Sequence, residues 1–229
     1  MDKLVDYLCI IQARLNSTRL PAKIMLDLAG KTLLERVYET VSKSKKINKI
    51  IIATSDEKTD DIVEKKLQTL NIEYYRGSLN NVLERFFMAA KKYRAKNIIR
   101  ITADNPLMDA KVIDNLILHY ESNNSQYSVF KKAIYGLTAE VFSYQALSIA
   151  NENARNDYDK EHVTPYIKDN CIASNIDIEK KYRKSNLSIT IDTIEDYIKM
   201  QNLYLYFEKN KIEPSVDNYL FWVDNGEFI

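Results

Sequence analysis

The chain has 229 residues, of which 45% are hydrophobic and 28% charged, and its 33 basic and 32 acidic residues leave a formal net charge of +1. This composition is that of a soluble globular protein, and the charge balance argues against one that coats nucleic acid or another polyanion. We find no run of the ~18 apolar residues needed to cross a membrane and no pattern of a secretory leader, so we expect a cytoplasmic protein without a membrane partner. Cys9 and Cys171 lie in apolar runs, which predicts buried thiols rather than a disulfide.

The first half of the chain alternates short apolar runs with segments of helical periodicity. Apolar runs without polar alternation are typical of strands that are buried on both faces. We predict strands at Tyr7–Gln12, Lys49–Ala53, Ile72–Tyr75 and Asn97–Thr102, and helices at Thr32–Lys43, Thr59–Leu70, Asn80–Tyr93 and Ala110–Glu121. This order predicts βαβ units, a mainly parallel sheet and a three-layer α/β/α sandwich.

The pattern is less regular beyond about Asn123. Here we predict strands at Glu140–Phe142, Ile172–Ile178 and Leu187–Ile191, and helices at Tyr144–Asn153, Glu161–Lys168 and Ile194–Lys209. Without a repeat, a low-complexity tract or a linker, one domain over residues 1–229 is the simplest organisation. The tail from about residue 210 carries Tyr219, Phe221, Trp222 and Phe228, and either covers its own core or packs on a sister subunit in a homodimer.

A cationic loop follows the first predicted strand, where parallel α/β sheets bind their ligands. It contains Ala13, Arg14, Asn16, Ser17, Thr18, Arg19 and Lys23. Backbone amides and hydroxyls can donate to phosphate oxygens, while three cations offset negative charge, so the loop suits a triphosphate. It has no Walker motif, and the alternative is a solvated basic turn.

Two aspartates follow predicted strands that are remote in sequence. Asp104 lies in a Thr-Ala-Asp-Asn-Pro turn, and Asp192 precedes Thr193, a predicted helix N-cap. Carboxylates beside phosphates are typical ligands of Mg²⁺, although Asp before Asn-Pro is also a common turn former. The N-cap accounts for the acidic residues in the first turn of the following helix. It does not account for Asp192, which is therefore a candidate for a second metal ligand.

Eight segments resemble, in order, the CMP-sugar synthetase superfamily of cytidylyltransferases, and within it the branch named for spore-coat polysaccharide biosynthesis. They are QARLNSTRLPAK, LAGKTLLERV, IIATSD, YYRGSLNNVLERF, RITADNPLMD, YGLTAEVF, YDKEHVTPYI and ITIDTIEDY. The resemblance implies a Rossmann-like sandwich with a mainly parallel mixed sheet, of the nucleotide-diphospho-sugar transferase type. It also implies transfer of CMP from CTP to a small acidic acceptor, a sugar acid or phosphorylated metabolite, with release of pyrophosphate in surface polysaccharide or glycoconjugate biosynthesis.

The resemblance also assigns roles to residues. It implies that Arg14, Lys23 and Asp104 are catalytic and that Asp104 and Asp192 bind Mg²⁺. It also implies that the cationic loop holds the triphosphate. Further nucleotide contacts fall on Thr54, Ser55, Arg76, Asn81 and Arg85. Glu140, His162 and Tyr158 become candidates for acceptor binding, although His162 and its neighbours could equally be a helix-capping cluster.

This chain departs from the family pattern at Ile194, which replaces a Pro with little chemical consequence, and at three positions that matter more. Asn16 and Ala22 stand where the family loop has Gly, and Thr138 stands where the branch often has Asp. Asn tolerates left-handed backbone, so Asn16 can keep the turn, whereas a positive φ would strain Ala22. Thr138 removes a carboxylate that the resemblance would place in contact with the acceptor or the metal ion.

Two alternative functions stay open. A sugar-nucleotide glycosyltransferase of similar fold commonly carries a D-x-D motif, where this chain has only Asp104-Asn105-Pro106. A catalytically inactive nucleotide-binding module would explain the three departures.

Overall fold

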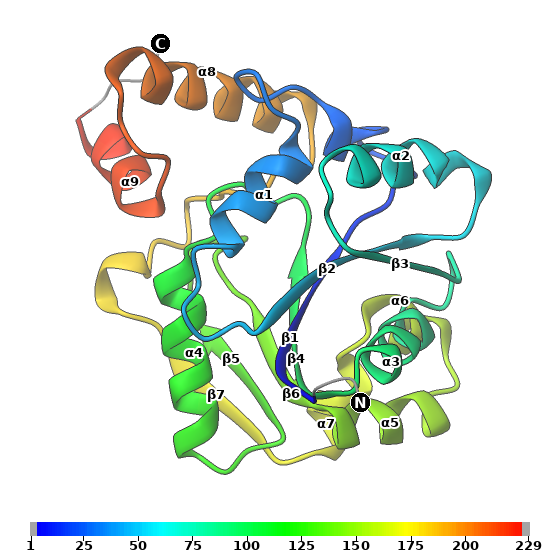
Figure 1. Cartoon of the computed structure of the whole chain (residues 1–229). Helices are drawn as coiled ribbons and strands as arrows, with labels where there is room; N and C mark the ends of the chain where they lie inside the picture. The colour runs from blue at the N-terminus through cyan, green and yellow to red at the C-terminus, as the bar shows by residue number, and fades with distance from the viewer. Residues whose placement is uncertain (1–3, 226–229) are drawn as a thin grey trace.

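The computed structural model describes residues 4–225, and within this range seven strands form one sheet in the order β3-β2-β1-β4-β6-β5-β7 (Figure 1). The strands are β1 (Val5–Gln12), β2 (Lys49–Ser55), β3 (Tyr74–Gly77), β4 (Ala95–Thr102), β5 (Tyr127–Lys131), β6 (Glu140–Ser143) and β7 (Ala173–Asp177). β6 is antiparallel to its neighbours β4 and β5, and the other pairs are parallel. The predicted fold class, an α/β sandwich with a mainly parallel mixed sheet, is confirmed.

Helices cover both faces of the sheet. They are α1 (Leu33–Val41), α2 (Asp61–Thr69), α3 (Val82–Lys92), α4 (Ala110–Ser122), α5 (Tyr144–Asn153), α6 (Asp157–His162), α7 (Pro165–Asn170), α8 (Ile194–Asn210) and α9 (Val216–Asp224). Single 3₁₀ turns lie at Lys23–Met25, Lys58–Asp60 and Lys180–Tyr182. No helix among the described residues is long and apolar enough to cross a membrane.

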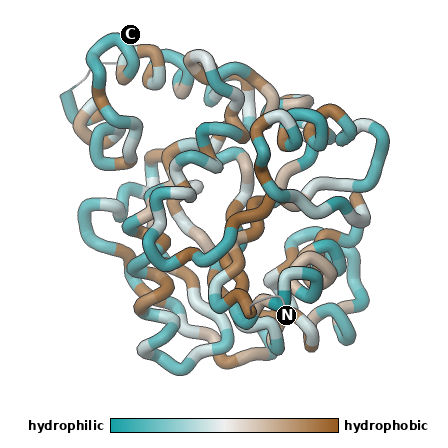
Figure 2. The backbone as a smooth tube through the Cα atoms, in the orientation of Figure 1, coloured by the Kyte–Doolittle hydropathy of each residue, from teal (hydrophilic) through white to brown (hydrophobic). Residues whose placement is uncertain are grey.

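Alternate residues of each strand point into two separate cores. In β1, Cys9 and Ile11 pack with side chains of α1, α4 and α8, whereas Leu8 and Ile10 pack with those of α3 and α5. The central strands are therefore hydrophobic along their length, and the hydrophilic segments lie in the outer turns (Figure 2). Cys9 is buried, as predicted, but Cys171 is partly exposed, and both are free thiols.

The second half of the chain differs from the prediction in several elements. β5 was not predicted, because its Ser and Lys residues interrupt the apolar pattern. Leu187–Ile191 is not a strand but an extended segment with one bridge between Tyr135 and Ser188. The helix predicted at Glu161–Lys168 is divided, because Val163 has a φ of 70° and α7 restarts with Pro165 in its first turn.

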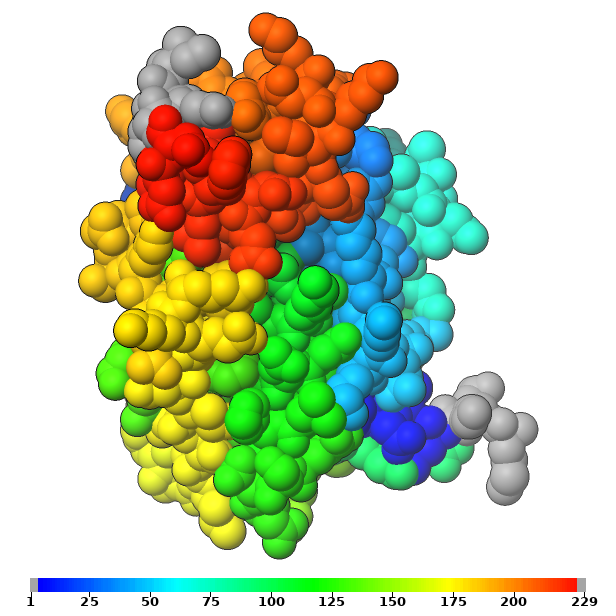
Figure 3. Space-filling view, turned by 90° about the vertical axis from the view of Figure 1, so that its left-hand side faces the viewer, coloured from blue at the N-terminus to red at the C-terminus, as the bar shows by residue number. Residues whose placement is uncertain are grey.

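The described part of the tail packs on the chain's own core. It forms α9, which was not predicted, and buries Val216, Tyr219, Leu220 and Trp222 against the core that α4 and α8 share. Figure 3 shows α9 and the end of α8 in red and orange above the green α4. Phe221 is 60% exposed, and Phe228 lies outside the described residues.

The register of the sheet places the carboxyl ends of β1, β2 and β4 at the same level. Gln12 in β1 lies opposite Ala53 in β2 and Thr102 in β4, and the amides of Ala13 and Ala103 donate across these strand ends. The loops that follow β1, β2 and β4 therefore leave the sheet at one edge.

Within the loop after β1, Ala22 has φ 56° and ψ 21°, the left-handed conformation that strains a residue with a β-carbon. Asn16, in contrast, is outside the left-handed region, so its side chain causes no such strain and the turn does not depend on it.

We expect Ala22→Gly to raise the free energy of unfolding by about 1 kcal/mol, since glycine adopts this conformation without strain. Urea unfolding monitored by circular dichroism measures the change. Ala110→Gly, at the first residue of α4 and outside the left-handed region, is the control and should lower stability. A destabilised Ala22→Gly variant would contradict the strain argument.

Candidate active site

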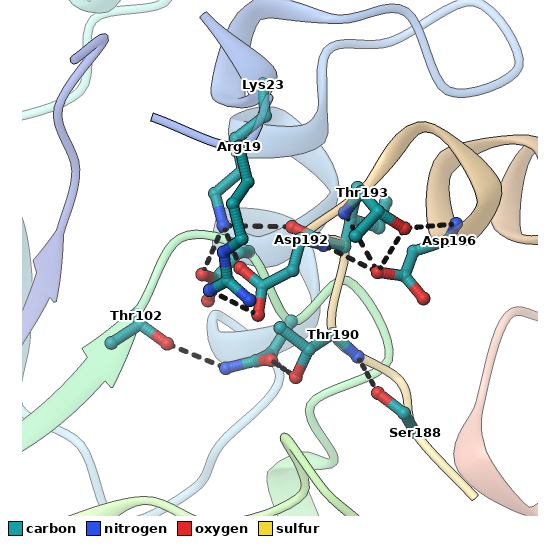
Figure 4. Close-up of polar contacts among 11 residues, drawn as sticks. Arg19, Lys23, Thr102, Ser188, Thr190, Asp192, Thr193 and Asp196 are labelled. Atoms are coloured by element: carbon teal, nitrogen blue, oxygen red, sulfur yellow. Dashed lines mark hydrogen bonds and ion pairs between the residues drawn. The ribbon is translucent and has the colours of Figure 1, made fainter. Parts of the chain in front are cut away.

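Lys23 joins the two aspartates that the sequence singles out. Its ammonium group is 2.7 Å from Oδ2 of Asp104 and 2.9 Å from Oδ1 of Asp192, and it also donates to the carbonyl oxygen of Ile191 at 2.9 Å. Arg19 pairs with the other oxygen of Asp192 at 2.9 Å. Figure 4 shows both basic side chains reaching down onto Asp192 from the loop after β1. The cationic loop and the two aspartates therefore converge on one site.

A backbone contact brings the two aspartates together. The amide of Ile191 donates to the carbonyl oxygen of Asp104 at 2.9 Å, which fixes the extended segment before α8 beside the turn after β4. Thr193 is the N-cap of α8, as predicted, and forms a capping box with Asp196. The Asp192 carboxylate takes no part in that cap and faces Lys23.

A chain of hydrogen bonds connects the end of β4, the turn that carries Asp104 and the segment that carries Asp192. Asn105 donates to Thr102 at 2.7 Å and accepts from Thr190 at 2.7 Å (Figure 4). Gly136, with a φ of 92°, lies so close to Asn105 and Thr190 that a β-carbon there would clash with both side chains. The loop between β5 and β6 thus needs glycine to pack against the turn that carries Asp104.

These residues line a pocket of about 760 Å³ at the edge of the sheet. Six basic and four acidic side chains face it, a surplus of two positive charges: Arg14, Arg19, Lys23, Arg100, Lys132 and Lys168 against Asp104, Glu140, Glu161 and Asp192. A pocket with this surplus attracts anions.

The predicted loop residues Asn16, Ser17 and Thr18 also line the pocket. Arg14 does so too, and pairs with Glu161 of α6 at 3.2 Å. Ala13 is buried behind them.

Thr54 and Ser55 are fully buried, and their hydroxyl groups donate to Asp60 rather than facing the pocket. Asp60 also accepts from the amide of Leu15 at 3.0 Å, so it ties the cationic loop to the end of β2. Burial acts to raise the pKa of Asp60, but the donors from Ser55, Leu15 and Thr54 outweigh it and lower the pKa. No sequence pattern distinguishes Asp60, which is buried, from the exposed acids of the chain.

Three further residues predicted to contact nucleotide lie around α2 and α3. Arg76 pairs with Asp61 and Glu64 of α2, and Asn81 caps α3. Arg85 is 1% exposed, and burial, followed by repulsion from Arg14, lowers its pKa to about 10. These side chains do not face the pocket in the described structure, and their nucleotide contacts stay predictions.

Two of the three described residues that carry unsatisfied polar atoms, Arg100 and Asp104, line this pocket, and the third, Arg85, does not. Among the described residues, four buried side-chain atoms have no hydrogen-bond partner: Nε and Nη2 of Arg85, Nε of Arg100 and Oδ1 of Asp104. Buried polar atoms are nearly always satisfied, so such exceptions call for an explanation. The free oxygen of Asp104 is suited to a cation, and the arginine nitrogens to an anion or a polar ligand.

The two aspartates fit a magnesium ion. Mg²⁺ is commonly held by one or two carboxylates together with substrate phosphates and water. Asp104 and Asp192 supply two carboxylates at the pocket, and Asp104 has a spare oxygen. Within residues 4–225, no group of three or more His, Cys, Asp or Glu side chains gathers as a metal site, so phosphate would complete the ligand set.

The predicted acceptor residue Glu140 lies at the other end of the pocket in a buried network. One oxygen accepts from Tyr127 at 2.6 Å and Thr164 at 2.8 Å and pairs with Lys168 at 2.7 Å, and the other accepts from Arg100 at 2.5 Å. Arg100 and Lys168 were not among the predicted site residues. A charged residue within the buried strand NIIRIT was an available signal for Arg100, but nothing in the pattern marked Lys168.

Of the other acceptor candidates, His162 lines the pocket and Tyr158 does not. The ring of Tyr158 packs on His162 at 4.5 Å and is 64% exposed. Their contacts with an acceptor stay predictions.

Comparison with known proteins gives consistent matches over most of the chain. The family model described as cytidylyltransferase matches residues 8–216. The spore coat polysaccharide biosynthesis protein SpsF of Bacillus subtilis is 35% identical over 207 residues, which cover 87% of this chain and 86% of that protein. The 3-deoxy-manno-octulosonate cytidylyltransferase of Chloroherpeton thalassium is 35% identical over 118 residues, 50% of this chain and 46% of that protein. Among solved structures, a cytidylyltransferase from Leptospira borgpetersenii superposes with a TM-score of 0.88 at 29% identity, covering 97% of this chain and 96% of that one.

We expect Gly136→Ala to lower the free energy of unfolding by about 3 kcal/mol, because the added methyl group displaces Asn105 and Thr190. Gly30→Ala is the matched control. Its φ is 82° but nothing lies within 4 Å of the added methyl, so only backbone strain of about 1 kcal/mol remains. Equal losses in urea unfolding would show that the close approach at Gly136 is unimportant.

Glu140 should make stability depend on pH. Burial acts to raise its pKa, but Arg100 and Lys168 outweigh it and hold the pKa at about 2, below the usual value of 4.5. Because the pKa is lower in the folded chain, the ionised carboxylate stabilises the fold above about pH 4.5, and this contribution is lost as the pH falls toward 2. We expect Glu140→Gln to cost about 3 kcal/mol at pH 7 and progressively less below pH 4.5 in urea unfolding.

Glu213→Gln is the control for this experiment, since that carboxylate is exposed and pairs only with Lys43. A cost of Glu140→Gln that stays constant from pH 7 to pH 3 would rule out the ionised network.

Proposed function

The chain belongs to the cytidylyltransferase family, and on that premise we propose that it transfers the CMP group of CTP to a small acidic acceptor and releases pyrophosphate. It is a CTP-dependent nucleotidyltransferase. The observation that carries the proposal is the convergence of Lys23, Asp104 and Asp192 in a pocket with surplus positive charge.

The cationic loop supports binding of the triphosphate. Arg14, Arg19 and Lys23 line the same side of the pocket as Asn16, Ser17 and Thr18. Charged donors and hydroxyl groups on one loop can surround phosphate oxygens. Arg85 has two buried nitrogens without a partner in the described structure but does not line the pocket, so its contact with the nucleotide stays a prediction.

The reaction requires an in-line displacement at the α-phosphorus. An acceptor oxygen attacks, the new P–O bond forms, and the bond to the bridging oxygen of the β-phosphate breaks with its electrons leaving on pyrophosphate. Positioning and charge stabilisation carry this chemistry, because no covalent intermediate is needed. Lys23 and Arg14 would stabilise the charge that grows on the α-phosphate and the leaving group.

Lys23 must exchange partners during this cycle. Its three protons are already directed at Asp104, Asp192 and the carbonyl oxygen of Ile191. An ammonium group has only three donors, so Lys23 has to release at least one protein oxygen before it donates to a phosphate. Asp104 and Asp192 would hold Mg²⁺, which neutralises phosphate charge when bound.

The names of two relatives support a proposal for the biological setting. The SpsF protein is named for spore coat polysaccharide biosynthesis, and a second relative for cytidylyl transfer to 3-deoxy-manno-octulosonate. We infer that the acceptor here is a sugar acid or a phosphorylated metabolite and that the product enters surface polysaccharide or glycoconjugate synthesis. The free thiols Cys9 and Cys171 favour the predicted cytoplasmic location.

A pyrophosphate-release assay tests the proposal. Each of the four nucleoside triphosphates is combined with Mg²⁺ and with a panel of sugar acids and phosphorylated acceptors. We expect release with CTP and at least one acidic acceptor. CTP binding by calorimetry without turnover on any acceptor would favour an inactive module, and turnover of a sugar nucleotide without pyrophosphate would favour a glycosyltransferase.

We expect Lys23→Ala and Asp104→Ala each to lower turnover at least about a hundredfold, because each removes a preorganised charge from the reacting phosphate. Circular dichroism should show an intact fold in both variants. Lys31→Ala is the control, since Lys31 is half-exposed, pairs with Glu39 and does not line the pocket. Near-normal turnover in either variant would refute the role given to that residue.

A further inference from the structure

Asp60 occupies the N-cap position of α2 but does not cap that helix. An aspartate at this position usually accepts a hydrogen bond from an amide of the first helical turn. The side chain of Asp60 forms no such bond in the described structure. It is 1% exposed, does not line the pocket, and is turned toward two other segments, the end of β2 and the cationic loop. Helix capping is therefore not the role of this carboxylate.

The two oxygens of Asp60 have different partners. Oδ2 accepts from three donors at the end of β2: the hydroxyl of Thr54 at 2.9 Å, and the amide and hydroxyl of Ser55 at 3.0 and 2.5 Å. Oδ1 accepts from one donor, the amide of Leu15 at 3.0 Å, which lies 45 residues away in the sequence. A buried carboxylate needs donors for its oxygens, and here they come from two separate segments. The carboxylate therefore joins the cationic loop to the sheet.

The backbone of Leu15 closes the cationic loop. Its carbonyl oxygen accepts from the amides of Ser17 at 2.8 Å and Ala22 at 3.0 Å, and its side chain packs against the core that α1 and α8 share. Leu15 does not line the pocket, whereas the adjacent Arg14 does. Asp60 therefore holds the loop at a residue that does not face the pocket but sets the path of those that do.

The charge of Asp60, taken alone, opposes the binding of a triphosphate. Burial and then Arg14 lower the pKa of Arg85, and Asp60 acts in the opposite direction, so its charge reaches these arginines. Removal of a negative charge beside the loop should by itself strengthen the binding of an anion. An electrostatic effect and a positioning effect of Asp60 therefore have opposite signs, and one measurement of affinity separates them.

We propose that Asp60 is a positioning residue for CTP, which holds the cationic loop in its phosphate-binding shape before the nucleotide arrives. This inference rests on the proposed function, in which that loop binds the triphosphate, and extends it to a residue that touches no ligand. Donors that are already fixed lose little conformational freedom when phosphate binds, so a fixed loop binds more tightly than a mobile one. That gain outweighs the unfavourable charge of Asp60.

Asp60→Asn tests this role, because asparagine has one acceptor oxygen where aspartate has two. That oxygen can serve the three donors at the end of β2, which leaves the side-chain amide group facing the amide of Leu15, donor against donor. Asp114→Asn is the matched control. The Asp114 carboxylate also accepts from two loop amides, those of Lys45 and Lys46 at 3.0 and 3.2 Å, and from a serine hydroxyl, but it does not line the pocket.

Calorimetric titration with CTP and Mg²⁺ measures the affinity without an acceptor. We expect Asp60→Asn to raise the Kd for CTP roughly tenfold to a hundredfold, the scale of loss that a displacement of about 1 Å produces. Asp114→Asn should change this Kd less than about twofold. Both substitutions should lower Tm by roughly 2–8 °C, since each removes an acceptor from backbone amides. With an acceptor that turns over, Asp60→Asn should raise the KM for CTP and leave the acceptor KM unchanged.

Hydrogen exchange in the unsubstituted chain is a second measurement, and it decides the question if Asp60→Asn does not fold. We expect the amide of Leu15, followed by NMR without nucleotide, to exchange at least about a hundredfold more slowly than in an unstructured peptide. Fast exchange would show that the loop is not fixed before the nucleotide binds, and would overturn the proposal.

Two results of the titration would also overturn the positioning role. One is a Kd for CTP in Asp60→Asn that is unchanged or lower, since the charge effect would then dominate. The other is an equal rise in Asp114→Asn, which would reflect a general loss of stability. In both cases the unsubstituted chain still binds CTP, and the proposed function stands. An unsubstituted chain that binds no CTP would instead refute the proposed function, and this inference with it.

Discussion

The contact of one ammonium group with two carboxylates organises this molecule. Lys23 comes from the loop after β1, Asp104 from the turn after β4, and Asp192 from the segment before α8, so three remote parts of the chain meet at one cation. Two acids held this close would repel each other without it. The contact therefore holds together, before any ligand is present, the two carboxylates that we propose to bind Mg²⁺.

The supporting structure explains why these groups stay in place. The amide of Ile191 ties the two aspartate segments together, and Gly136 lets the loop between β5 and β6 pack against Asn105 and Thr190. Asp60 fixes the cationic loop from the opposite side through the amide of Leu15. The charged side chains are thus set by backbone contacts and buried polar groups that take no part in the chemistry.

Local pattern was enough to predict the first half of the fold and one end of the site. Buried strands such as β1 and β4 are continuous apolar runs, and the acids and cations at their carboxyl ends stand out in the sequence. The second half could not be predicted equally well, because β5 includes the buried hydroxyl of Ser128 and Leu187–Ile191 lies extended with only one bridge to its neighbour. Arg100 was missed because it meets Glu140 through the antiparallel pairing of β4 with β6, and Lys168 because it reaches Glu140 from α7, and neither relation is encoded in a local pattern.

The reversed direction of β6 has a consequence for how such enzymes diversify. Because β6 runs opposite to β4, its first residue, Glu140, meets the pocket, and the segment before it, with Tyr135, Gly136 and Thr138, forms part of the wall. The loops after β1 and β2 belong to the other half of the sheet. On the proposed function, changes in the other wall residues of the β5–β6 connection that keep Gly136 would alter which molecule receives the nucleotide and leave the turn that carries Asp104 in place, a modular route by which one scaffold acquires new specificities.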